Sequence, residues 1–136
     1  MITFLPSANF DECARVLDDK RLGGQRTEAW SILNWLRNPE QYRNFVRAGY
    51  CTMWCGFEPA LVKYLNAILR EWDRRGKNSD LLKAGDPGRG LDEVEGQEVA
   101  MPPWMGMEAL HSYHRSALMA KNPEHYGQFG WAESGE

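Results

Sequence analysis

The chain has 136 residues, enough for one domain that buries a core without disulfide or metal support. Its composition is 43% hydrophobic and 26% charged, as in globular proteins, and no apolar run approaches the roughly 20 residues that span a bilayer. The absence of a signal-peptide pattern and the odd number of cysteines (three) predict a cytoplasmic protein with free thiols. The net charge of −3 argues against a uniformly basic DNA-binding surface.

The first predicted element is a helix capped by Asn9. Its apolar residues recur at helical spacing: Phe10, Cys13, Val16 and Leu17. The pair Gly23-Gly24 is expected to interrupt the helix, because glycine is costly inside helices and readily adopts left-handed conformations. A second helix then runs to about Arg37 and ends at Asn38-Pro39.

Three further helical segments are expected. Residues 40–48 form a short amphipathic piece. A long helix begins at Pro59, which is favourable in a first turn, and ends at Arg74-Arg75, just before Gly76. The last helix runs from about Met107 to Ala120 and stops before Asn122-Pro123. The sequence therefore predicts an all-α fold, a single compact multi-helix domain over residues 1–136.

An acidic segment rich in Gly and Pro, residues 84–103, is expected to form an exposed loop before the last helix. Residues 1–85 carry 13 Lys and Arg against 10 Asp and Glu, whereas residues 86–136 carry 3 against 9. The first part of the chain can therefore present a locally basic face although the whole protein is acidic.

The most informative stretch is residues 17–33. It places cationic and amide side chains beside one carboxylate, Glu28: Lys20, Arg21, Gln25 and Arg26. Cations around a carboxylate suit a site that holds an anionic substrate, on which the carboxylate acts by proton transfer or charge stabilisation. The residues alone equally allow a helix N-terminus preceded by a solvated charge cluster.

Two pairs later in the chain are candidate metal ligands, Cys51 with Cys55 and His111 with His114. The cysteine spacing is loose and a long helix separates the pairs, so we expect no metal, but buried thiols and hydrogen-bonded histidines. His111, His114 and Arg115 share one side of the last helix, which suits either phosphate binding or an ordinary polar face.

Three collinear blocks of sequence carry a family resemblance. They are Leu17, Asp19 and Leu22 ahead of Glu28; Ala48-Gly49 to Thr52, continued without a gap to Arg75-Gly76 and Asn78; and Asn122-Pro123 with Tyr126 and Phe129-Gly130. With these blocks in this order, the chain resembles the pyrimidine-dimer DNA glycosylases of the phage endonuclease V type, in a divergent branch.

The resemblance implies an all-helical monomeric enzyme, without a cofactor, that binds duplex DNA at a damaged pyrimidine. Its reaction is an N-glycosylase step coupled to an abasic-site lyase step, in which a protein amine attacks the sugar C1′ beside an essential glutamate. That glutamate falls on Glu28. Since Ile2 is too bulky for ordinary removal of the initiator methionine, the attacking amine is expected to be that of Met1.

The resemblance also implies the residues that contact DNA. They come from the first block and from the end of the chain: Lys20, Arg21, Gln25, Arg26, His114, Arg115, Lys121 and Tyr126. Three alternatives stay open: an enzyme that processes modified pyrimidines in phage DNA, a non-catalytic nucleic-acid-binding module with the same fold, and an ordinary protein-interaction domain.

Overall fold

The fold begins with a short helix that the sequence specifies locally. In a computed structural model, which describes residues 2–77, 94 and 96–135, helix α1 (Phe10–Val16) starts after Asn9. The Asn9 side chain accepts a hydrogen bond of 2.9 Å from the N–H of Glu12, so the predicted cap is confirmed. Leu17 and Asp18 then adopt extended conformations and turn the chain into the next helix.

The prediction that Gly23-Gly24 breaks the helix is wrong. Helix α2 (Asp19–Arg37) runs through both glycines, and the chain breaks earlier, at Leu17 and Asp18. A Cβ atom on Gly23 would lie 3.1 Å from the Trp72 ring, so the missing side chain lets α5 approach α2 closely. Close packing between helices offsets the helix-breaking tendency of glycine here.

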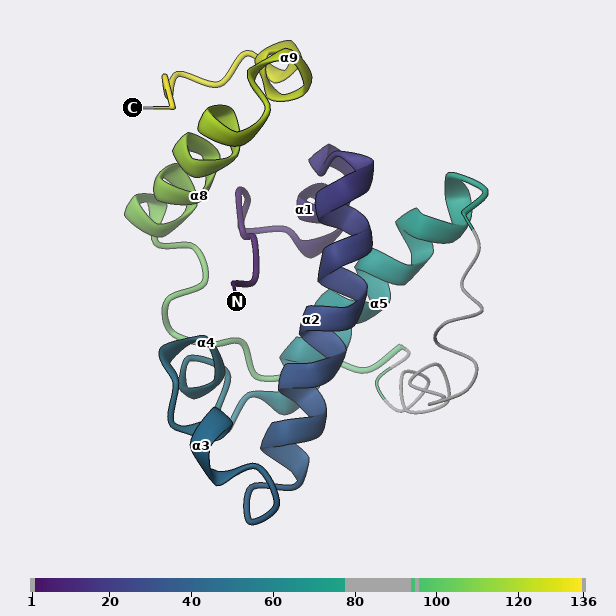
Figure 1. Ribbon diagram of the computed structural model, residues 1–136, viewed down its shortest axis with the longest axis vertical. Helices are drawn as coiled ribbons and strands as arrows, with labels where there is room; N and C mark the ends of the chain where they lie inside the picture. The colour runs from purple at the N-terminus through teal and green to yellow at the C-terminus, as the bar shows by residue number, and fades with distance from the viewer. Residues whose placement is uncertain (1, 78–93, 95, 136) are drawn as a thin grey trace.

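Helices α3 (Arg43–Val46) and α4 (Gly49–Thr52) turn the chain towards the long helix α5 (Glu58–Arg74), which packs across α2 and α1 (Figure 1). The core between these helices consists of fully buried apolar side chains, including Leu22, Ile32, Leu33, Leu61, Leu65 and Ile68. Each such side chain contributes about 2 kcal/mol by leaving water, so this packing holds α2 and α5 in place.

The C-terminal part consists of α8 (Glu108–Lys121), α9 (Pro123–Tyr126) and the 3₁₀ helix η2 (Gly127–Phe129). The predicted last helix is thus confirmed to within one residue at each end. The acidic loop predicted over residues 84–103 lies in part outside the described residues. Of its described residues, 96–103 are irregular and mostly exposed, whereas Val94 is buried.

Every regular element in the described part of the chain is helical, which confirms the all-α prediction. None of the described helices is long and apolar enough to cross a membrane. Residues 2–6, which we call the N-terminal segment, adopt no regular structure and run between α8 and α2 (Figure 1). Their position places the start of the chain in the middle of the fold.

A candidate active site around the N-terminal segment

The N-terminal segment is held by side chains, because the described part of the chain contains no strand with which its backbone could pair. Phe4 and Leu5 are buried, so their backbone polar groups need partners inside the protein. The Phe4 N–H donates to Oε1 of Gln25 at 3.1 Å, and the Tyr64 hydroxyl lies 3.0 Å from the Phe4 carbonyl. Helices α2 and α5 therefore supply the partners on one side of the segment.

Helix α8 supplies the partners on the other side. His114 Nδ1 accepts from the Leu5 N–H at 3.2 Å, and His111 Nδ1 donates to the Leu5 carbonyl at 2.8 Å. His111 Nε2 accepts from the Gly106 N–H at 3.0 Å, which assigns the ring proton to Nδ1. Arg115 Nη1 donates to the Pro6 carbonyl at 2.9 Å. The side of α8 predicted to bind phosphate thus binds protein backbone.

Both histidines are suited to neutral hydrogen bonding. Burial, with a smaller effect from His111, lowers the pKa of His114 to about 4, so its ring is uncharged at neutral pH and Nδ1 is free to accept. Both ring nitrogens of His111 already have protein partners. No group of three or more His, Cys, Asp or Glu side chains arranged for a metal is found within residues 2–77, 94 and 96–135.

The carboxylate of Glu28 lies beside the N-terminal segment. Gln25 Nε2 donates to the Ile2 carbonyl at 2.8 Å and to Glu28 Oε2 at 2.9 Å, so one amide nitrogen joins the two groups. Gln25 is 1% exposed and its oxygen is also in contact with Phe4 N–H and the Tyr64 hydroxyl. The Gln25 amide is therefore fully engaged within the protein, while Glu28 is half-buried. Met1, the predicted source of the amine, lies outside the described residues.

Arg26 lies on a different side of α2 and differs from Gln25 in its hydrogen bonding. It is 4% exposed, and its guanidinium carbon lies 4.1 Å from the centre of the Trp72 ring. Its Nε and Nη1 atoms have no hydrogen-bond partner in the described structure. Burial lowers the pKa of Arg26, and only the negative charge of Asp73 opposes this effect. A buried cation with unpaired donors is costly, which is a common property of ligand-binding groups.

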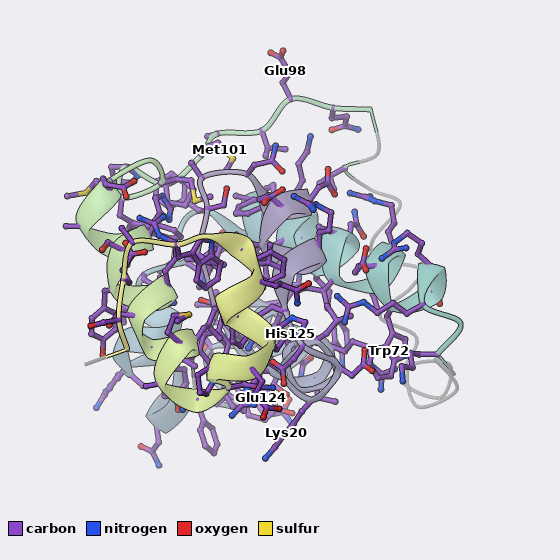
Figure 2. The ribbon with its side chains drawn as sticks, turned by 90° about the horizontal axis from the view of Figure 1, so that it is seen from above. Lys20, Trp72, Glu98, Met101, Glu124 and His125 are labelled. Atoms are coloured by element: carbon purple, nitrogen blue, oxygen red, sulfur yellow. The ribbon has the colours of Figure 1, made fainter. Side chains whose placement is uncertain are left out.

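The remaining predicted DNA contacts of α2 are at its N-terminus. Arg21 Nη1 forms an ion pair of 3.1 Å with Asp18. Lys20 is exposed and extends away from the body of the molecule (Figure 2). Lys20 is thus accessible to a ligand, whereas Arg21 already has a partner within the protein.

The predicted contacts near the C-terminus stabilise the docking of the tail. Arg115 is ion-paired with Glu133 at 3.0 Å and with Glu108, which raises the pKa of Arg115 and lowers that of Glu133 to about 2. Tyr126 is fully buried, and its hydroxyl accepts from the Asp18 N–H at 3.0 Å and donates to the Asp18 carboxylate. Lys121, in the last turn of α8, is exposed.

The structure therefore brings Gln25, Glu28, His114 and Arg115 together along the N-terminal segment, and it leaves Lys20, Arg26 and Lys121 apart from them. Sequence reasoning missed Tyr64, which completes the Gln25 network. The available signal was a hydroxyl on the apolar face of the long helix, where a buried polar group needs a partner.

Comparison with known proteins adds one match. The family described as pyrimidine dimer DNA glycosylase matches residues 1–84, more than half of the chain. The match includes the N-terminal segment, Gln25 and Glu28, whereas α8 with its two histidines lies beyond it. No curated protein and no solved structure matches the chain.

Proposed function

Since the chain belongs to the pyrimidine dimer DNA glycosylase family, we propose that it releases damaged pyrimidines, in particular pyrimidine dimers, from duplex DNA. Family membership indicates a DNA glycosylase with a role in DNA repair. The proposal adds the class of lesion, a coupled abasic-site lyase step, and the residues that carry out the two steps.

One observation carries this proposal: the Glu28 carboxylate and the Ile2 carbonyl accept hydrogen bonds from the same nitrogen of Gln25. The carboxylate is therefore close to the backbone of the residue that follows Met1. An α-amino group has a pKa near ~8, so a useful fraction is neutral and nucleophilic at physiological pH. A carboxylate beside such an amine can orient it and stabilise a cationic sugar.

The proposed reaction has two steps. The neutral Met1 amine forms a bond to C1′ of the sugar, the bond from C1′ to the base breaks, and the base leaves with the electron pair and takes up a proton. Opening of the sugar ring then gives a Schiff base between C1′ and the amine. Loss of a proton from C2′ expels the 3′ phosphate, and water hydrolyses the Schiff base to release the enzyme. Glu28 stabilises positive charge in the first step and transfers protons in the second.

The proposed DNA contacts differ in availability. Lys20 and Lys121 are exposed, so these two are our preferred phosphate ligands. Arg26 has unpaired donors but is buried over Trp72, so we propose that it binds a phosphate only after its side chain moves off that ring. Gln25, His114, Arg115 and Tyr126 are engaged with other parts of the protein, and we assign them to positioning of the N-terminal segment and the tail. Arg21 holds Asp18 at the junction of α1 and α2.

Borohydride trapping tests the proposal. The protein is incubated with UV-irradiated duplex DNA and borohydride, which reduces a Schiff base to a stable adduct. We expect an adduct whose modified residue, mapped by mass spectrometry, is Met1, and we expect Glu28→Gln to abolish it. Glu124→Gln, at an exposed glutamate of α9, is the matched control and should form the adduct normally.

The outcomes separate the remaining alternatives. Binding of damaged DNA without base release or adduct would indicate a non-catalytic module. Activity on DNA with modified pyrimidines, but not on irradiated DNA, would indicate an enzyme that processes modified pyrimidines in phage DNA. The absence of binding, base release and adduct with all of these DNAs contradicts the proposal.

A further inference from the structure

An exposed surface at one end of the molecule combines arginine and aromatic side chains. It is formed by the C-terminal part of α2 and by α3, at the end opposite α9 (Figure 1). We define this arginine–aromatic surface by five residues: Trp35, Tyr42, Arg43, Phe45 and Arg47. The proposed chemistry of Glu28 does not use any of them.

The aromatic rings form a stack that ends in solvent. The Phe45 ring lies parallel to the Trp35 ring, with centroids 4.5 Å apart and an interplanar angle of 16°. Tyr42 borders both rings, with centroids 6.3 Å from Trp35 and 6.4 Å from Phe45. Phe45 is nevertheless 45% exposed, unusual for a phenylalanine in a packed cluster. Because almost half of Phe45 is accessible, a planar ligand can contact this ring at the surface.

The charge of this surface is opposite to that of the whole protein. Residues 35–50 contain three arginines and one acidic residue, Glu40, in a chain whose net charge is −3. Arg43 and Arg47 are exposed, and they are the first residue and the C-cap of α3, so the two cations flank this short helix. An aromatic ring open to stacking, flanked by cations, is complementary to a nucleotide, whose base is planar and whose phosphate is anionic.

The surface lies within reach of the proposed active site. Trp35 follows Glu28 by seven residues in α2, which is two turns, so both side chains lie on nearly the same face and about 10 Å apart along the axis. The segment around α4 joins the two places: the Tyr50 ring lies 6.2 Å from Trp35, and Trp54 Nε1 donates to Thr3 Oγ1 at 3.1 Å. About 10 Å corresponds to roughly three stacked nucleotides at 3.4 Å each.

We propose that the arginine–aromatic surface binds an unpaired nucleotide of the DNA substrate, a few positions from the reacting nucleotide. The base stacks on Phe45, and Arg43 and Arg47 hold the adjacent phosphates. Excision of a base requires the duplex to be locally opened, and a stacking surface stabilises the opened strand. The inference rests on the proposed function for its reference point, Glu28, but the binding it describes is measurable without catalysis.

The test compares Phe45→Ala, the double variant Arg43→Glu with Arg47→Glu, and the wild-type protein. Both arginines are exposed, so the double variant should keep the wild-type unfolding temperature. Phe45→Ala also removes the stacking contact with Trp35, so the unfolding temperature of every variant is measured first and binding is compared where all of them are folded. Binding is measured by fluorescence anisotropy on a fully paired duplex and on the same duplex with three unpaired nucleotides, at several salt concentrations.

We expect Phe45→Ala to weaken binding to the partly unpaired DNA about tenfold and to leave the fully paired duplex almost unchanged, since only an unpaired base can stack. Phe45→Trp should restore binding. The double arginine variant should weaken binding to both DNAs and reduce the slope of log K against log salt by about 1.5 to 2. Arg15→Glu, at an exposed arginine of α1 outside the arginine–aromatic surface, is the control for charge and should have little effect.

The result that overturns the inference is wild-type affinity in both surface variants, or an equal loss in the Arg15→Glu control. Failure of the proposed function is recognised separately. If the wild-type protein forms no borohydride adduct and yet the variants lose DNA binding as described, the surface is supported and the catalytic assignment is not. If the adduct forms and the variants bind normally, the catalytic assignment stands and the surface is refuted.

Discussion

On one side of α2, the Gln25 amide has a partner for each of its polar atoms, and the N-terminal segment is fixed beside Glu28. On another side, one residue further along the helix, the Arg26 guanidinium is equally inaccessible to water but leaves two donors unpaired. The first arrangement stabilises the free protein, and the second destabilises it. We infer that the Gln25 side serves the geometry of the site, whereas the Arg26 side is prepared for a negatively charged ligand.

The largest expected effect comes from removing the Gln25 amide. Gln25→Leu keeps the approximate volume but leaves the Phe4 N–H and the Ile2 carbonyl without the partner that Gln25 supplies, while the Tyr64 hydroxyl keeps the Phe4 carbonyl. Since each unpaired buried group costs about 1 to 3 kcal/mol, we expect the free energy of unfolding to fall by about 4 kcal/mol in urea denaturation. Gln41→Leu, at an exposed glutamine, is the control. A loss below about 1 kcal/mol for Gln25→Leu would show that the network does not hold the segment.

The next largest effect is a pH dependence of the free energy of unfolding, caused by His114, which also holds the N-terminal segment. The pKa of His114 is lowered from 6.5 to about 4 in the folded protein, so the unfolded chain binds a proton more readily between these values. Stability is therefore complete above about pH 6.5 and is lost as the pH falls towards 4, by on the order of 3 kcal/mol. Chemical denaturation across this range measures the loss. His114→Gln, which keeps an acceptor for Leu5 but cannot titrate, should flatten the curve, and an unchanged curve would refute the assignment.

The smallest effect has the opposite sign and concerns Arg26. Arg26→Met removes the buried charge and its unpaired donors but keeps an apolar side chain over Trp72. Because the desolvation cost exceeds the stabilisation from the ring, we expect the free energy of unfolding to rise by about 1 kcal/mol. The same variant should bind DNA more weakly. Lys20→Met, at an exposed cation of the same helix, is the control and should leave the free energy of unfolding unchanged. A clear destabilisation by Arg26→Met would show that the Arg26 side stabilises the free protein, as the Gln25 side does.

Local signals predicted much of the fold. The Asn9 cap, the start of the long helix at Pro59 and the stop of the last helix before Pro123 each depend on neighbouring residues, and the structure has them in the predicted places. The predicted helix break at Gly23-Gly24 was wrong because the conformation there depends on Trp72, about fifty residues away, whose ring packs where a side chain of residue 23 would otherwise be.

The candidate site was harder to predict for the same reason. Glu28 was singled out by the family resemblance, but nothing near it in sequence indicates that Gln25 joins it to Ile2. The spacing of His111 and His114 correctly placed both on one side of a helix, and it could not show that this side faces Leu5. Pairing between distant segments leaves no periodic pattern in either one.

The contacts between the N-terminal segment and α8 also have a consequence for the order of folding. They join residues more than 100 positions apart, whereas the packing of α2 on α5 closes much shorter loops. Short loops close first, so α1, α2 and α5 can assemble while Leu5 and Pro6 still lack their partners on α8. During synthesis these residues leave the ribosome before α8 does, so their contacts with α8 form only after α8 has been made. The α8 contacts of Leu5 and Pro6 are thus completed late, and we expect the protein to become competent for its proposed reaction only after α8 has folded against the N-terminal segment.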